Sequence, residues 1–414
     1  MMDVIVIGAG PAGLAGAIAC ASYGLNVTVI DEFIKPGGRL LGQLHQEPSG
    51  EWWNGIREAE RLQQEAKELG VDIRCGVSVY NLEKEDRLWN VHTTIGTLEA
   101  PFVLLATGAA EYSIPLPGWT LPGVMSIGAA QVMTNVHRVQ VGRKGIVIGA
   151  NILAFAIVNE LQLAGITVDR IVLPEKSPLS QKAGEPAEVI KSLVNAAHLA
   201  PSRLLRIGGR LMGSDWIRQI GLKFYPKNGV NVNGTPLQLR QAALEIIGTE
   251  QVEGVRIASI DANGDLIAGS DTVYEADFVC IAGGLYPLAE LAAVAGCSFH
   301  YLPELGGHVP HHTESMETPL AGLFVAGNIT GIESGKIAMA QGTVAGLSIA
   351  SHAGKGVDIV DRELRHAMQM VRTVRKQAAI QFNPDIVSGR DKMNTLWERL
   401  YANNGMDKAK KKIV

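Results

Sequence analysis

A chain of 414 residues is too long for one ordinary hydrophobic core and predicts two or three domains. Hydrophobic residues make up 47% of it, charged residues 19%, and there are 47 glycines; this excludes a disordered or fibrous chain and indicates an α/β protein with many tight turns. The net charge is −4 and the one basic run is 408–412, so no nucleic-acid partner is expected. No uninterrupted apolar stretch reaches the roughly 18 residues of a membrane span.

The earliest predicted elements form a strand, a turn and a helix at the start of the chain. Residues 3–7 (DVIVI) form a short β-branched run, as in a strand buried on both faces. The glycine turn 8–13 follows, then a small-residue helix to about Tyr23 and a second strand over 26–32. This order is a βαβ unit.

The glycines of this first turn fall where a dinucleotide-binding turn needs them. Gly8 allows the tight turn, Gly10 lets a pyrophosphate approach the backbone, and Gly13 permits close packing of helix on strand. Asp31 ends the second strand, where an acidic residue holds ribose hydroxyls, and Glu32 lies beside it. Pro11 and Ala12 complete the predicted cofactor-binding motif.

The middle of the chain alternates short strands with turns. Residues 71–80 and 87–95 are predicted as strands of a small antiparallel sheet, and 101–108 as a buried strand. The runs 277–284 and 322–328 are predicted as two more buried strands that enter glycine turns.

A second βαβ unit begins at Gly145, with a helix to about Ala164 and a strand over 167–175. Its turn carries Gly149 and ends at Ala154, but Asn151 replaces the glycine that makes room for pyrophosphate. Three alternatives stay open for this turn: NAD(P)H, another adenine nucleotide, or no ligand. The candidate residues for a second nucleotide are Gly149, Asn151, Ile152, Leu153 and Glu175, with Lys176 a candidate for a phosphate.

Two later stretches favour FAD over NAD at the first turn. Residues 104–109 (LLATGA) and 322–342 resemble the further fingerprints of the two-dinucleotide-domain flavoprotein oxidoreductases, the glutathione and thioredoxin reductase superfamily. Residues 35–43 add two glycines where backbone would pass a flavin. The resemblance implies these further FAD contacts: Gly38, Arg39, Val79, Thr107, Gly108, Gly327, Asn328, Gly335 and Lys336.

One position departs from that superfamily. Its later motif normally reads A-G-D, and here it reads Ala326-Gly327-Asn328. Asn keeps an acceptor and gains donors while it gives up the charge, so FAD binding is still expected.

The stretches 106–131 and 277–297 narrow the resemblance. They look like the FAD-bearing alpha-type subunits of amine-oxidising complexes, a group that includes hydrogen cyanide synthase, opine oxidases, dye-linked proline dehydrogenases and heteromeric sarcosine oxidase. In that group a smaller flavoprotein subunit oxidises the amine. The resemblance therefore implies such a partner for this chain.

The cysteines depart from many members of that group. No cysteine follows Cys297, so an iron–sulfur cluster would have to come from a separate protein. Cys20, Cys75, Cys280 and Cys297 are isolated from one another, which excludes a C-x-x-C dithiol and disulfide reductase chemistry and favours a cytoplasmic protein.

The segment from about Val360 to Tyr401 is predicted as amphipathic helix, and its aromatic residues Phe382, Trp397 and Tyr401 suit either a docking surface or a packed cap. The expected fold is α/β, with two Rossmann-like domains, the second inserted in a split FAD domain, and a helical tail. The predicted segments are 1–115 (FAD domain, first part), 116–275 (NAD(P)-binding-like domain), 276–355 (FAD domain, second part) and 356–414 (helical tail).

Two further groups of polar residues carry possible chemistry. His308, His311 and His312 lie close together, but a polar loop is the favoured interpretation over a metal site. Lys336 is a weak catalytic candidate, because a lysine near a flavin could stabilise the charge of the reduced ring; a solvated lysine at a helix start is the equal alternative.

Three functions follow as hypotheses. The first is an FAD-dependent oxidoreductase subunit of a heteromeric amino-acid or amine dehydrogenase or oxidase (opine, proline or sarcosine-like). The second is a stand-alone NAD(P)H-dependent FAD reductase. The third is a scaffold subunit with structural FAD and a non-redox nucleotide.

Overall fold

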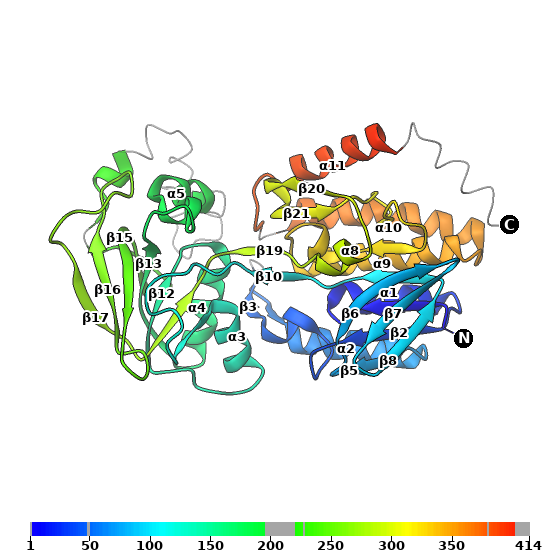
Figure 1. The fold of residues 1–414 in the computed structure, drawn as a ribbon, viewed down its shortest axis with the longest axis horizontal. Coiled ribbons are helices and arrows are strands. Elements are labelled where there is room, and N and C mark those ends of the chain that lie inside the picture. The colour runs from blue at the N-terminus through cyan, green and yellow to red at the C-terminus, as the bar shows by residue number, and fades with distance from the viewer. Residues whose placement is uncertain (1, 48–49, 195–219, 227, 379–380, 402–414) are drawn as a thin grey trace. The chain divides into compact units, whose positions relative to one another are not determined.

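The computed structural model describes residues 2–47, 50–194, 220–226, 228–378 and 381–401. The chain divides into two compact units (Figure 1). Unit 1 comprises residues 1–43, 54–110 and 286–414, and unit 2 comprises residues 44–53 and 111–285. The chain passes between them at β10 (Ala109–Glu111) and β19 (Leu285–Pro287), which pair with each other.

Unit 1 is built on a five-stranded sheet in the order β22-β9-β1-β2-β5, in which every neighbouring pair is parallel. Val4 of the central strand pairs with Val27 on one side and Phe102 on the other. The apolar runs predicted as strands are therefore confirmed, and each ends at the same edge of the sheet. The strands are β1 (Val4–Ile7), β2 (Val27–Asp31), β5 (Asp72–Cys75), β9 (Phe102–Leu105) and β22 (Leu323–Val325).

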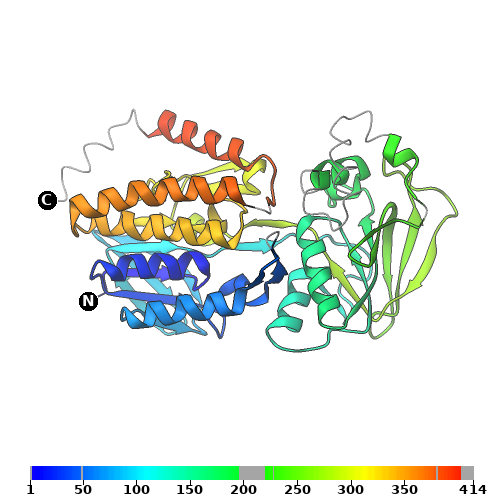
Figure 2. The same ribbon diagram turned by 180° about the vertical axis from the view of Figure 1, so that it is seen from behind.

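Helices α1 (Pro11–Ser22) and α9 (Gly335–His352) pack against each other, and α9 also contacts α10 (Val357–Gln377), as Figures 1 and 2 show. The α1–α9 contact is a backbone contact. A Cβ added at Gly342 would lie 2.0 Å from the Ala12 oxygen, and one at Gly346 would lie 2.4 Å from the Gly16 oxygen. Glycine is required at these positions because no side chain fits between the helices.

An apolar cluster beside the sheet takes in residues of β6 (Val79–Glu85), β7 (Leu88–Thr93) and α8 (Glu290–Val294). Trp89 is fully buried there. The prediction of 71–80 and 87–95 as one small antiparallel sheet is wrong for its first half, because β5 pairs in parallel with β2. The antiparallel sheet is β6-β7-β8, with β8 at Gly96–Ala100. Unit 1 also contains α2 (Gly55–Glu68), η1 (Gly38–Gly42) and η5 (Gly327–Thr330).

The C-terminal helices of the described chain are packed on unit 1. Helix α11 (Ile386–Leu400) contacts η4 (Pro303–Leu305), beside β20 (Phe299–Leu302) and β21 (Gly307–Pro310). Ile386 and Met393 are buried in a cluster with Leu305 and Val309. These contacts show that the described part of the tail packs on unit 1, and a docking surface on it stays a prediction.

Unit 2 has an eight-stranded sheet in the order β11-β18-β12-β13-β15-β16-β17, with β14 paired to β15. Val147 and Ile146 are neighbours that point to opposite faces of β12, and they belong to two separate apolar clusters. Both faces of the sheet are therefore covered. The strands are β11 (Val124–Ser126), β12 (Lys144–Ile148), β13 (Thr167–Pro174), β14 (Val230–Val232), β15 (Thr235–Ile247), β16 (Gly254–Ser259), β17 (Thr272–Glu275) and β18 (Phe278–Ile281). The helices are α3 (Ile127–Asn135), α4 (Ile152–Leu163), η2 (Gln181–Gly184) and α5 (Pro186–Val194), and a hairpin of β3 (Leu44–Gln46) and β4 (Trp52–Asn54) completes the described part.

The compact units differ from the predicted segments over residues 44–53, 111–115 and 276–285, all of which group with unit 2. Strand β18 pairs with β11 and β12 of unit 2, although it lies beyond the predicted boundary at 275/276. Its buried FVCI run suits the centre of either sheet, so composition alone could not assign it. Residues 44–53, predicted within the first segment, also group with unit 2.

Glu160 of α4 is a buried carboxylate held by neutral donors. It is 4% exposed and accepts hydrogen bonds from the Leu44 backbone N–H (3.1 Å), the Gln131 amide (2.7 Å) and the Asn135 amide (3.0 Å). Burial raises its pKa to about 7 against the partial opposition of these donors.

None of the helices within the described ranges is long and apolar enough to cross a bilayer.

Substitution of Gly342 by Ala should destabilise unit 1. The new Cβ meets backbone of α1, which cannot move aside as a flexible side chain could, and overpacking of this kind costs about 1–3 kcal/mol. The matched control is Thr343→Ala, since the Thr343 hydroxyl bonds to Met339 of its own helix; that change should stay within about 0.5 kcal/mol. Chemical denaturation of the two variants measures the difference, and equal stabilities would contradict the backbone contact.

Glu160 should make stability fall as pH rises through the neutral range. Its pKa is raised in the folded state above the ordinary value of 4.5, so the folded state holds a proton that the unfolded state has lost. The contribution is fully present below pH 4.5 and disappears as pH passes 7, a loss of about 3 kcal/mol at most. The unfolding free energy of the parent relative to Glu160→Gln should therefore fall by up to about 3 kcal/mol between pH 4.5 and 8, and a constant difference would contradict this explanation.

Candidate functional site

The first glycine turn (residues 8–13) follows β1 and begins α1. Gly8 has φ +106°, and a Cβ there would lie 2.4 Å from the Ala106 oxygen, while a Cβ at Gly13 would lie 1.8 Å from the Gly8 oxygen. A Cβ at Gly10 would meet only the Gly38 Cα, at 4.0 Å. Two glycines are thus required by packing, and the third leaves open space at the start of α1.

That open space suits an anion. Gly10 is the N-cap of α1, it provides no side-chain cap, and Pro11 occupies the first turn. The helix N-terminus carries N–H groups and a partial positive charge, which favour a pyrophosphate. The turn therefore fits the predicted dinucleotide.

Asp31 joins the end of β2 to this turn. Its Oδ2 accepts from the Ala9 N–H at 2.6 Å and its Oδ1 from the Phe33 N–H at 2.8 Å. Burial raises the pKa of Asp31, and the two backbone donors oppose that shift. Glu32 is exposed. Since each carboxylate oxygen can accept a second bond, Asp31 can hold a ribose hydroxyl while it fixes the turn.

The segment after Asp31 folds back on the turn. The Gly37 N–H donates to the Ala9 oxygen at 2.8 Å, and a Cβ at Gly38 would lie 2.9 Å from the Gly10 Cα. Arg39 follows in η1 and donates to the Ala109 oxygen at 3.0 Å. The structure thus brings Gly38 into contact with Gly10, as the expected flavin-side glycines require.

The ends of β9 and β22 come to the same sheet edge. Thr107 donates to the Leu288 oxygen, and Gly108, with φ +81°, has open space where a Cβ would stand. Gly327, with φ +80°, lies against Ala12, and a Cβ there would be 2.8 Å from the Ala12 Cβ. Three separate sequence motifs therefore meet around one turn.

Asn328 uses its acceptor inside its own loop, where its Oδ1 accepts from the Glu333 N–H at 3.1 Å. The remaining predicted contacts lie nearby in chain position. Val79 starts β6, two residues after Val77, whose N–H donates to the Asp31 oxygen at 3.1 Å. Gly335 begins α9, where a Cβ would lie 3.0 Å from Leu40 Cδ2, and Lys336 is exposed in the same turn.

A buried ion-pair cluster lies beside the Gly327–Gly335 loop, and the sequence did not predict it. Glu333 is 6% exposed; its Oε1 and Oε2 accept from Arg375 at 2.6 and 3.0 Å, and Oε2 also accepts from Arg390 at 2.6 Å. Burial pushes the pKa of Glu333 up, but Arg390 and Arg375 outweigh it and hold the pKa below its ordinary value. The two arginines come from α10 and α11, so the tail helices are tied to the loop by charge as well as by packing.

The three histidines divide between strand β21, which contains His308, and the loop after it, which contains His311 and His312. His308 is an exposed residue of strand β21, whereas His311 and His312 are 5% and 3% exposed. His312 Nδ1 bonds to the Pro310 oxygen at 2.7 Å, and Arg390 approaches its Nε2 at 3.2 Å. Burial and the Arg390 charge lower the pKa of His312 to about 3, so it is neutral. His311 and His312 are therefore polar side chains in a buried environment, and Arg390 lies beside His312.

The second glycine turn differs from the first at its helix start. Gly149 has φ +111°, with a Cβ position 2.3 Å from the Ala282 oxygen, so this part of the turn is formed. Asn151 is the N-cap of α4: its Oδ1 accepts from the Ala154 N–H at 2.9 Å and its amide donates to the Ala282 oxygen at 2.9 Å. The side chain therefore takes a first-turn N–H of the kind that a pyrophosphate would use.

The other candidates around the second turn are more open to solvent. Ile152 and Leu153 begin α4 and are half-buried. Glu175 follows β13 and is exposed, and the exposed Lys176 donates to the Asn263 oxygen at 3.1 Å. Lys176 is thus directed to a neighbouring loop of unit 2, whereas Asn151 bonds to the end of β18.

Asp31→Ala should weaken FAD binding more than Glu32→Ala. Asp31 accepts a hydrogen bond from the Ala9 N–H of the turn, while Glu32 is exposed. Removal of the Asp31 carboxylate therefore removes both the expected partner of the ribose and the bond that holds Ala9 in place. We expect at least about a tenfold rise in the FAD dissociation constant for Asp31→Ala, equivalent to one charge-assisted hydrogen bond, and less than about threefold for Glu32→Ala. Titration of the deflavinated proteins with FAD measures both, and equal losses would contradict the role of Asp31.

Asn151→Gly should increase affinity for NADH or NADPH, because it uncovers the α4 N-terminus. Asn151→Asp is the matched control, since it keeps the capping oxygen and adds a charge that repels a pyrophosphate. Equilibrium binding of each nicotinamide nucleotide to the parent and both variants gives the order. If the parent binds as tightly as Asn151→Gly, the side chain does not block the site.

Comparisons with known proteins agree with this geometry. A pyridine nucleotide-disulphide oxidoreductase domain matches residues 2–181. An opine oxidase subunit from Agrobacterium tumefaciens is 28% identical over 84% of this chain and 65% of its own length, so the chain spans slightly less than two thirds of that relative. The HcnB subunit of hydrogen cyanide synthase from Pseudomonas aeruginosa is 25% identical over 91% of this chain and 77% of its length.

Among solved structures, L-proline dehydrogenase from P. horikoshii shares the fold with a TM-score of 0.61 at 20% identity, over 88% of this chain and 58% of that one. The expected resemblance and α/β fold are confirmed. The matched domain, the relatives and the fold agree in their similarity to FAD oxidoreductases with two dinucleotide-binding domains.

Proposed function

We propose that this chain is the FAD-bearing subunit of a heteromeric dehydrogenase or oxidase that acts on C–N bonds of amino acids or amines. One observation carries the proposal: the first turn offers an uncapped helix N-terminus to a dinucleotide, while Asn151 caps the equivalent helix in the second. The names of the relatives, which are subunits of opine oxidase and of hydrogen cyanide synthase, support a heteromeric assembly.

The residues around the first turn would hold FAD in defined ways. The N–H groups at the start of α1 and the open space at Gly10 would receive the pyrophosphate, and Asp31 would bind the ribose. Gly108 and Gly38 would let backbone approach the cofactor, and Asn328 would stand near the Gly327 turn with its amide as a donor. Bound FAD supplies two-electron redox chemistry, and the chain supplies binding and orientation.

In this proposal the electrons reach the FAD of this chain from a smaller flavoprotein subunit. That partner would oxidise an amine to an imine, with loss of two electrons and two protons, and the electrons would pass to this chain. An iron–sulfur centre, if the complex uses one, would come from a further protein, because the four cysteines here are free and separate in sequence. A cytoplasmic location is part of the proposal and agrees with free cysteines.

A second candidate function is a free-standing NAD(P)H-dependent FAD reductase. The matched domain favours it, since its description names a pyridine nucleotide. The βαβ geometry around Gly149 is intact in unit 2, and the capping side chain is what argues against a bound dinucleotide. A scaffold role with structural FAD and a non-redox nucleotide is the remaining alternative.

The subunit proposal predicts that this chain co-purifies with a second, amine-oxidising flavoprotein. Anaerobic addition of an opine, proline or sarcosine to the complex should reduce the FAD of this chain, whereas the same amine added to this chain alone should leave it oxidised. Absorbance of the oxidised flavin band reports both results. Reduction of the isolated chain by an amine would show that it carries its own amine site, and a flavin that no donor reduces would favour the scaffold.

A further inference from the structure

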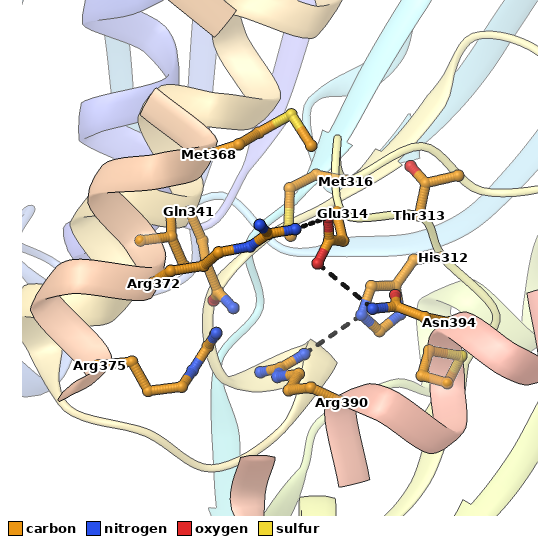
Figure 3. Close-up of a pocket in the computed structure, with 12 residues that line it drawn as sticks. His312, Thr313, Glu314, Met316, Gln341, Met368, Arg372, Arg375, Arg390 and Asn394 are labelled. Carbon is orange, nitrogen blue, oxygen red and sulfur yellow. Dashed lines mark hydrogen bonds and ion pairs between the residues drawn. The ribbon is translucent and has the colours of Figure 1, made fainter. Parts of the chain in front are cut away.

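A cavity in unit 1 lies apart from the glycine turns, under the C-terminal helices. Residues of the 312–316 segment, α10 and α11 line it, together with Gln341 of α9 (Figure 3). Its volume of about 40 Å³ is room for about three water molecules, which is too small for a nucleotide and close to the size of a short organic anion.

The polar wall of this cavity carries an excess of positive charge. Arg372, Arg375 and Arg390 turn their guanidinium groups toward it from two helices (Figure 3). Two carboxylates pair with them: Glu333 with both Arg375 and Arg390, and Glu314 with Arg372 at 2.5 Å. Three cations against two anions leave one positive charge uncompensated within the cluster.

Among the residues that line the cavity, no further side chain carries a compensating negative charge. His312 lines the cavity but is neutral, because burial and Arg390 lower its pKa to about 3. The Nε of Arg390 is buried and has no hydrogen-bond partner among the described residues. A buried donor without a partner costs about 1–3 kcal/mol, so an acceptor that reached this cluster would be favoured.

Part of the remaining wall is apolar. Met316, Met393 and Val371 are buried side chains that line the cavity, and Met368 joins them. Methionine adapts its shape to irregular aliphatic groups. The cavity therefore combines a cationic wall with an aliphatic one.

We propose that this cavity is a binding site for a small aliphatic monocarboxylate. The carboxylate faces the arginine cluster, where planar guanidinium groups match its two oxygens, and a chain of one or two further carbons lies against the methionines. The proposal does not depend on the partner or substrate of the proposed function. It concerns a site adjacent to the cofactor loop, because Gln341 lines the cavity and also accepts from the Gly327 N–H at 3.1 Å.

Calorimetric titration of the full FAD-loaded chain with propionate, at constant ionic strength, tests the site. Saturable binding of propionate is expected, and propionamide, which has the same shape without the charge, should not bind measurably. Arg372→Gln should raise the propionate dissociation constant about tenfold, the effect of one charge-assisted hydrogen bond. Arg372 is half-exposed and pairs with Glu314, so the variant should fold.

Glu314→Gln is the opposite variant and guards against a general loss of structure. It removes the carboxylate that competes for Arg372 and should lower the propionate dissociation constant at least about threefold. Equal binding of propionate and propionamide would overturn the proposal, as would no binding, or unchanged propionate affinity in both variants. The flavin content of each variant is measured separately. A change in propionate binding without loss of FAD concerns this cavity alone, whereas loss of FAD concerns the proposed function.

Discussion

The backbone contact between α1 and α9 holds the first glycine turn and the Gly327 turn of unit 1 together. Gly342 and Gly346 let the two helices meet without side chains between them. This contact brings the Gly327 turn, which precedes α9, against Ala12 of the first glycine turn. The proposed cofactor site is therefore made by chain segments that are far apart in the sequence, and the contact between these helices brings them together.

The same helix α9 connects the cradle to the tail. Gln341 bonds to the Gly327 N–H, and Glu333, just before α9, accepts from Arg375 and Arg390 of the tail helices. Removing one member of a buried ion pair leaves an uncompensated charge, which costs about 3–5 kcal/mol. Changes in the tail should thus affect the Gly327–Gly335 loop, although the tail lies outside the glycine turns proposed to bind FAD.

The two glycine turns differ in how the start of the following helix is capped. At Gly10 the helix start has no side-chain cap, and the space is open. At Asn151 the side chain satisfies a helix-start N–H and also reaches the Ala282 oxygen. A capped helix start needs no nucleotide to satisfy its N–H groups.

Much of the fold was predictable from local sequence. Apolar β-branched runs predicted β1, β2, β9 and β22, and glycine spacing predicted the first turn with Asp31 at its strand end.

Other features depend on contacts between distant residues. That the Asn151 amide caps α4 depends on backbone geometry. The assignment of β18 to unit 2 and of β5 to the parallel sheet follows from strand pairing, which composition does not encode. In the ion-pair cluster, Glu333 pairs with arginines that lie 42 and 57 positions later in the sequence. An acidic residue in a glycine-rich loop, followed by arginines in an amphipathic helix, was the one sequence feature that could have predicted it.

We propose that electrons enter this protein from a protein partner and not from a nicotinamide. The most direct test is anaerobic addition of NADH or NADPH to the isolated, FAD-loaded chain while the oxidised flavin absorbance is followed. We expect the band to persist, because Asn151 closes the helix N-terminus that the coenzyme needs. Rapid bleaching by either nucleotide would contradict the claim and favour the free-standing reductase.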